Sequence, residues 1–86
     1  MNLFMYSVRD ALTGFMTPVL EQNDAVAMRN FSMSCDVARR DSSLMSWKPS
    51  DFSLYCIASF DSDTGILTPV NPVRLVCNGD SVGGNK

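Results

Sequence analysis

One segment of the chain occurs twice. The run DALTGFMTPV at residues 10–19 returns as DSDTGILTPV at residues 61–70, with Asp, Thr, Gly, Thr, Pro and Val in the same places. The residues just before each run, 3–7 and 54–58, are also similar in size and polarity. A repeat of this kind constrains the architecture before any single residue does, because its copies are expected to fold alike. The chain is therefore expected to contain two related structural units.

Each unit has the pattern of a β-hairpin. The motif Asp-x-x-Thr-Gly lies between two strand-forming segments in both copies. It is typical of a tight turn that ends in a residue with positive φ. Gly14 and Gly65 adopt that conformation without steric cost, because glycine has no Cβ atom. We therefore predict hairpins that turn at residues 10–14 and 61–65.

The segment between the hairpins has the pattern of a helix. Asn23 is a good N-cap residue, and Asp24 suits the positive end of the helix dipole. The apolar residues that recur at three- and four-residue steps are Ala27, Met28, Phe31 and Cys35. We predict a helix over residues 24–37 and a short second helix that ends at Trp47, before Pro49.

These elements give an α+β fold of the order ββαββ. Residues 52–60 form the strongest strand pattern, and residues 73–77 indicate an extra strand. Pro18 and Pro69 each lack a ladder donor, so the second strand of each hairpin lies at a sheet edge or ends its pairing there. We predict a mainly antiparallel sheet of four to five strands in the order 2-1-3-4, covered on one face by the helix. We expect residues 1–77 to form a single domain and residues 78–86 to form a disordered tail.

The predicted central strands are apolar on both sides. Side chains alternate along a strand, so one face is expected to carry Leu3, Met5, Leu54, Cys56 and Ala58. The opposite face is expected to carry Phe4, Tyr6, Tyr55 and Ile57. A single helix covers one face only. Either the short second helix and the tail strand cover the second face, or a partner does. We predict that the face with Phe4, Tyr6, Tyr55 and Ile57 contacts a partner and that the protein forms a homo-oligomer. Tyr6 and Tyr55 on an open face could alternatively stack on nucleic-acid bases.

Composition argues against several classes of site. The chain has no histidine, and its three cysteines include no C-x-x-C pair, so we expect no metal site, no disulfide framework and no cofactor. Asp10, Asp61 and Asp63 fall in the predicted turns, where aspartate bonds its own backbone. We expect no enzymatic activity. No basic segment followed by an apolar segment opens the chain, and no apolar run approaches the ~20 residues of a membrane span. We therefore expect no membrane association.

One cluster of residues suggests contact with nucleic acid. Arg39, Arg40 and Lys48 lie close to Trp47 in the sequence, and Arg29 lies on the predicted helix. Cationic side chains neutralise phosphates, and an exposed indole stacks on an unpaired base. The alternative is structural: the two arginines suit the end of a helix dipole, and Trp47 fills the core between helix and sheet. The net charge of −2 also argues against simple electrostatic binding.

Three segments together resemble a known family. They are residues 23–31, 49–61 and 63–69, and the opening Tyr6-Ser7-Val8-x-Asp10 agrees with them. They are similar to the small nonstructural protein of gokushovirus-type microviruses, which are single-stranded DNA phages. The resemblance spans roughly residues 3–70. Because it lies in turns, a helix cap and core positions, it assigns no functional residue.

The resemblance implies a phage protein in the bacterial host cytoplasm that acts in replication or packaging of viral DNA. Together with the basic cluster, it predicts weak single-stranded DNA binding and self-association. The alternative is a protein-interaction module that regulates a viral or host replication protein without binding DNA.

Overall fold

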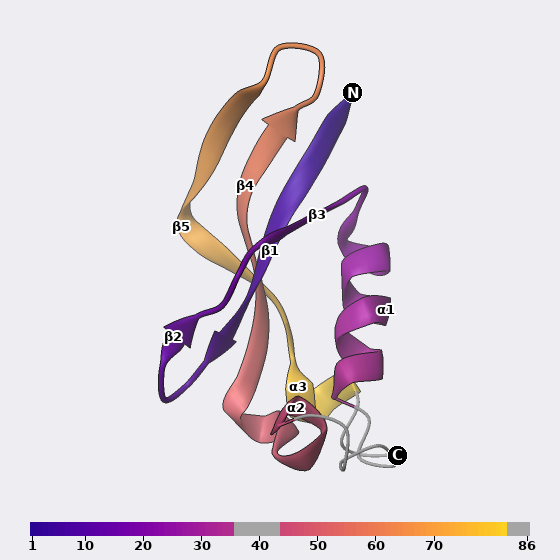
Figure 1. Ribbon diagram of the computed structural model, residues 1–86, viewed down its shortest axis with the longest axis vertical. Helices are drawn as coiled ribbons and strands as arrows, with labels where there is room; N and C mark the ends of the chain where they lie inside the picture. Colours follow the sequence, from indigo (N-terminus) through magenta and orange to yellow (C-terminus); the bar gives the residue numbers. More distant parts are fainter. Residues whose placement is uncertain (36–43, 83–86) are drawn as a thin grey trace.

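A computed structural model describes residues 1–35 and 44–82 of the chain. Its sheet is built around β1 (Asn2–Asp10), which pairs antiparallel with β4 (Phe52–Asp61) on one side. On its other side β1 pairs with β2 (Gly14–Phe15) and then with β3 (Val19–Glu21). The long strand β5 (Ile66–Asn78) pairs with β4 and forms the opposite edge. All of these pairings are antiparallel (Figure 1).

The principal helix, α1 (Asp24–Ser34), packs against one face of this sheet (Figure 1). Three short elements gather at one end of the molecule: α2 (Leu44–Trp47), the 3₁₀ helix η2 (Pro49–Asp51) and α3 (Gly79–Val82). The β4–β5 hairpin extends past α1 at the other end. As a result the molecule is elongated, with extents of 41 × 22 × 18 Å.

The predicted α+β class, the four- to five-stranded antiparallel sheet and the covering helix are confirmed. The strands differ in detail from the expected order. The second strand is split into β2 and β3, and the break at residues 16–18 includes Pro18, which has no N–H to donate. The expected extra strand at residues 73–77 is part of β5. The tail expected from residue 78 is corrected in its first half, because residues 79–82 form α3.

The two hairpin turns share their conformation as well as their sequence. Gly14 and Gly65 have φ angles of 98° and 77°, which is the predicted left-handed conformation. Asp10 Oδ1 accepts a hydrogen bond from the N–H of Leu12 at 2.9 Å. Asp61 Oδ1 accepts the matching bond from the N–H of Asp63, also at 2.9 Å. Each aspartate therefore stabilises its own turn.

The helix begins where the cap residue predicts. Asn23 Oδ1 accepts a hydrogen bond from the N–H of Val26 at 2.9 Å, and Asp24 follows in the first turn. The predicted apolar stripe is confirmed as the face that packs on the sheet. The buried core cluster consists of Tyr6, Ala27, Phe31, Cys35, Phe52, Leu54, Cys56 and Cys77.

An irregularity in β4 decides which side chains share a face. Tyr6 pairs with Cys56 and Met5 with Ala58, so Ile57 is an extra residue with no partner in β1. Such a bulge reverses the alternation of the strand that contains it. Before the bulge, Leu54 and Cys56 face α1. After it, Ala58 faces the opposite side, in agreement with its absence from the core cluster.

The predicted partner face is therefore not a single surface. Tyr6 is fully buried beneath α1, and Phe4 packs against the same core. Tyr55 pairs with Ser7 and lies on the other side of the sheet, which we call the open face. Ile57 is the bulged residue and is half-buried. The prediction grouped these residues because strict alternation was assumed for both strands.

Candidate nucleic-acid interface on the open sheet face

The predicted basic cluster is only partly within the described structure. Arg39 and Arg40 lie outside the described residues. Trp47, at the end of α2, is 62% exposed, and Lys48 beside it is also exposed. The alternative that Trp47 fills the core is therefore wrong. Within residues 1–35 and 44–82, Lys48 forms no salt bridge.

The structure places Arg29 away from the open face. It lies in the middle of α1 and its side chain is exposed, but α1 covers the opposite side of the sheet (Figure 1). The sequence grouped Arg29 with Arg39 and Arg40, and that grouping lies outside the described residues.

Two aromatic rings meet on the open face. Phe15 of β2 and Tyr55 of β4 have ring centroids 5.4 Å apart and an interplanar angle of 73°, an edge-to-face arrangement. These strands lie on either side of β1, so the rings meet across it. Ser7, the partner of Tyr55, is small and only 2% exposed, and its Oγ donates to the carbonyl of Met16 at 2.7 Å. A larger side chain at this position would separate the rings.

Arg9 belongs to the same face. It pairs directly with Phe15 on one side and Ser53 on the other, and opposed residues of neighbouring strands project to the same side. Its side chain is exposed. In the part of the chain that the structure describes, Arg9 makes no side-chain hydrogen bond and no salt bridge. The guanidinium group is thus available to an external anion.

Arg9 is the one charged residue at the paired, described positions of the open face. Phe4 pairs with Glu21 and Asn2 with Asp61, which places both acids on the side of α1. Asp10 pairs with the buried Phe52 and is itself 9% exposed. Arg74 pairs with Cys56 and reaches α1, as described below. The remaining large side chains of the open face are Leu3, Met5, Leu20, Phe60, Leu67 and Leu75.

A cluster of polar groups joins α1 to the sheet. Tyr6 Oη donates to Asp24 Oδ1 at 2.6 Å, and Arg74 Nη1 donates to Asp24 Oδ2 at 2.8 Å. The bonds from Arg74 and Tyr6 hold the pKa of Asp24 below its ordinary value. Burial, together with the bond to Asp24, raises the pKa of Tyr6. Both carboxylate oxygens are already engaged, so this cluster fixes the helix in place.

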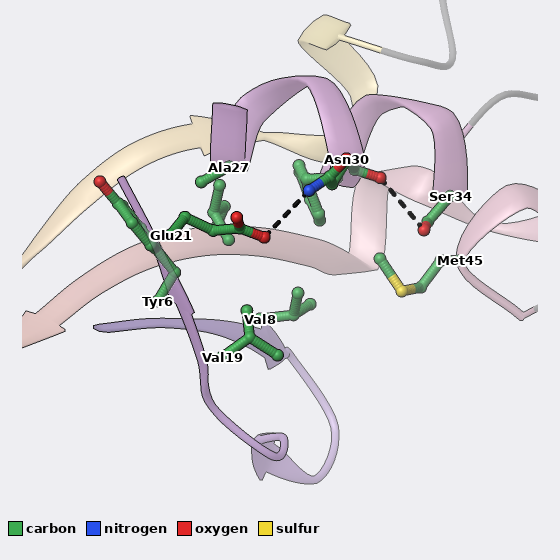
Figure 2. A pocket seen from close by; sticks show the side chains of 10 residues that line it. Tyr6, Val8, Val19, Glu21, Ala27, Asn30, Ser34 and Met45 are labelled. Atoms are coloured by element: carbon green, nitrogen blue, oxygen red, sulfur yellow. Dashed lines mark hydrogen bonds between the residues drawn. The ribbon is translucent and has the colours of Figure 1, made fainter. Parts of the chain in front are cut away.

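A cavity of about 170 Å³ lies between α1 and the strands β1 and β3. Its walls are mainly apolar and include Val8, Val19 and Met45 (Figure 2). At its rim, Asn30 Nδ2 donates to Glu21 Oε2 at 2.9 Å. Ser34 Oγ, which also lines the cavity, donates to the backbone carbonyl of Asn30 at 3.3 Å, so Asn30 is bonded to both Glu21 and Ser34.

Cys35, Cys56 and Cys77 are free and buried. Burial, with a contribution from Cys77, raises the pKa of Cys35 to about 11, and burial also raises the pKa of Cys77. Raised pKa values disfavour the reactive thiolate. Among the described residues, no group of three or more Cys, Asp or Glu side chains is placed to hold a metal ion. No described helix is long and apolar enough to cross a membrane.

Comparison with known proteins identifies the family. The profile of the family described as "Phage ORF5 protein" matches residues 3–82, which is almost the whole chain. The chain belongs to this Phage ORF5 family. It is therefore a bacteriophage protein. No curated protein and no solved structure matches the chain significantly.

Sequence reasoning did not find Arg9 and Phe15, which are two of several positions at which the copies of the repeat differ. Alignment of the two units sets Arg9 against Phe60 and Phe15 against Ile66. A cation and an aromatic ring thus stand in the first unit where the second has other residues.

Proposed function

We propose that this phage protein is the nonstructural protein of a gokushovirus-type phage. In this proposal it acts in viral DNA replication or packaging, in the host cytoplasm, without catalysis. It does so through weak binding of single-stranded DNA and through self-association. The observation that supports DNA binding is the exposure of Trp47 beside Lys48, at the end of the molecule where β1 and β2 also turn (Figure 1).

The chemistry of these residues suits an unpaired strand. An exposed indole stacks on a base of any sequence, and a neighbouring ammonium group neutralises a phosphate. Duplex DNA keeps its bases stacked inside, so it offers Trp47 no free base. The net charge of −2 opposes DNA at long range, so we expect binding to be weak. We expect it to fall with added salt because a cation that neutralises a phosphate releases bound counterions.

Self-association is supported by the opposite half of the open face. Leu3, Phe60 and Leu67 are aligned across β1, β4 and β5, and we call them the tip surface. Leu67 is 48% exposed although it is apolar. A second copy packing on the tip surface would bury these side chains without burying a charge.

The alternative function is a protein-interaction module that regulates a viral or host replication protein without binding DNA. The apolar character of most of the open face favours it, because exposed apolar patches commonly mark protein contacts. The two functions differ in one measurable property, which is affinity for an oligonucleotide.

The test is fluorescence anisotropy of a labelled single-stranded oligonucleotide across a salt series, with a duplex control. We expect saturable binding that favours the single strand and weakens with salt. Trp47→Leu and Lys48→Gln should each weaken binding, whereas Leu12→Ala, at an exposed turn position, should not. Sedimentation of the same samples, with Leu67→Lys as the variant, tests self-association. Absence of DNA binding at low salt would support the alternative.

A further inference from the structure

We infer that Arg9, Phe15 and Tyr55 form a second contact for single-stranded DNA, with a base stacked on the rings and its phosphate bound by the arginine. We call these three residues the aromatic platform. This inference rests on the proposed function and locates it on the open face. It adds a site that lies in the first hairpin and in β4.

The rings of the platform are available to a base. Phe15 is 49% exposed, and Tyr55 is half-buried at the surface of the sheet. Their edge-to-face packing covers at most one face of one ring, so other ring faces remain uncovered by the pair. Stacking on such a face does not depend on which base is present, as a sequence-tolerant binder requires.

The position of Arg9 matches the phosphate that accompanies a stacked base. Arg9 is directly opposite Phe15 in the β1–β2 pairing. Neighbouring strands lie about 4.8 Å apart, so the guanidinium group and the ring are within the span of one nucleotide. Because Arg9 has no acidic partner among the described residues, a phosphate would not have to displace one.

Charge decides between DNA and a second copy of the protein as the occupant of this half of the open face. A second copy packed here would bring its own platform and bury Arg9 in an apolar contact. The paired, described positions of the open face supply no acid to neutralise it. Burying an unpaired charge is strongly unfavourable. A phosphate supplies the negative charge that would neutralise Arg9. The tip surface carries no charge, so a second copy can pack on it without burying an unpaired one.

The experiment compares two labelled probes of equal length, an oligothymidylate and an abasic phosphodiester. Phe15→Leu and Tyr55→Leu should weaken oligothymidylate binding by about 5- to 100-fold and leave abasic binding unchanged, because only stacking is lost. Arg9→Gln should weaken both probes and lower the salt slope by about 1, whereas Arg9→Lys should largely retain binding. Ile66→Ala, at the far end of β5, is the matched control and should bind as wild type.

Backbone amide chemical shifts of the wild-type protein give a second measurement that needs no variant to fold. Titration with oligothymidylate should shift the signals of residues 9, 15 and 55, and of these three the abasic probe should shift residue 9 alone. Three results would overturn the inference. If DNA binds but the platform variants and signals are unaffected, the site is wrong and the proposed function stands. If the platform variants instead abolish self-association, the occupant is a second copy. If wild-type protein binds no DNA, the function and the site fail together.

Discussion

Asp24 accepts hydrogen bonds from two different strands. Tyr6 donates from β1 and Arg74 from β5, so one carboxylate connects the start of α1 to the strands on either side of β4. The two bonds differ in environment. Tyr6 is fully buried, whereas the side chains of Arg74 and Asp24 are 49% and 42% exposed. Surface ion pairs contribute little to stability, so the bond to Tyr6 is the more important one.

Removing this carboxylate should destabilise the protein measurably. Asp24→Ala leaves the buried hydroxyl of Tyr6 without an acceptor, which costs about 1–3 kcal/mol. Tyr6→Phe removes the hydroxyl itself, so no buried donor is left without an acceptor. The expected loss of stability is therefore smaller, about 0.5–1.5 kcal/mol. Urea denaturation followed by circular dichroism measures both values. An equal or larger loss in Tyr6→Phe would show that the hydroxyl is not the group left unsatisfied.

The same carboxylate should make stability depend on pH in acid. Its pKa lies below the ordinary value of 3.8 in the folded protein and returns to that value on unfolding. The contribution to stability is therefore complete above about pH 4 and is lost as the pH falls through the lower, folded pKa. Asp24→Asn lacks this contribution. The stability difference between wild type and Asp24→Asn should thus shrink between pH 6 and pH 3, and a constant difference would contradict the assignment.

At the scale of elements, the close contact of α3 with η2 depends on a residue without a side chain. A Cβ atom at Gly79 would contact the carbonyl oxygen of Pro49 and lie 3.0 Å from that of Phe52. Both atoms belong to the backbone, so they cannot move aside as a side chain does.

We therefore expect Gly79→Ala to destabilise the protein by about 1–3 kcal/mol, in the range of overpacked core sites. Ser50→Ala, at an exposed position in η2, is the control and should change stability by less than about 0.5 kcal/mol. Thermal denaturation compares the two variants. Wild-type stability in Gly79→Ala would mean that η2 and α3 are not packed this closely.

Elements with local signals were predictable from the sequence. The turns follow from Asp10, Asp61 and the two glycines with positive φ, and α1 follows from its cap and stripe. These signals act within a few residues, so one sequence is enough to see them. The split of the second strand was also anticipated by Pro18.

The faces of the sheet were not predictable in the same way. The bulge at Ile57 arises from how β4 pairs with its neighbours, and no glycine or proline marks it in β4. Because the prediction did not include this bulge, it placed Tyr6 and Tyr55 on the same face. The sequence left the exposure of Trp47 undecided for a related reason: propensity indicates the short helix α2, but not which side of it meets the core. Both depend on contacts between distant segments.

At the scale of the whole molecule, the covering helix protects only part of the sheet. The core residues of β4 and β5 are Phe52, Leu54, Cys56 and Cys77, all near one end. Residues 66–69 of β5, at the other end, are exposed. The proposed division of the open face corresponds to this difference in cover. The aromatic platform lies on the end of the sheet that α1 covers, and the tip surface lies beyond α1 (Figure 1).

This uneven support has a consequence for how the native protein opens. Free energies of local opening range from near zero up to the full stability of the fold, and strands over a packed core occupy the upper end. In hydrogen exchange monitored by NMR, the amides of Leu67 and Thr68 should exchange much faster than those of Leu75 and Cys77, although all four belong to β5. Uniform exchange along β5 would mean that the strand opens as one unit. If the tip surface is where two copies meet, its amides should slow with rising protein concentration, so a single strand would report both folding and assembly.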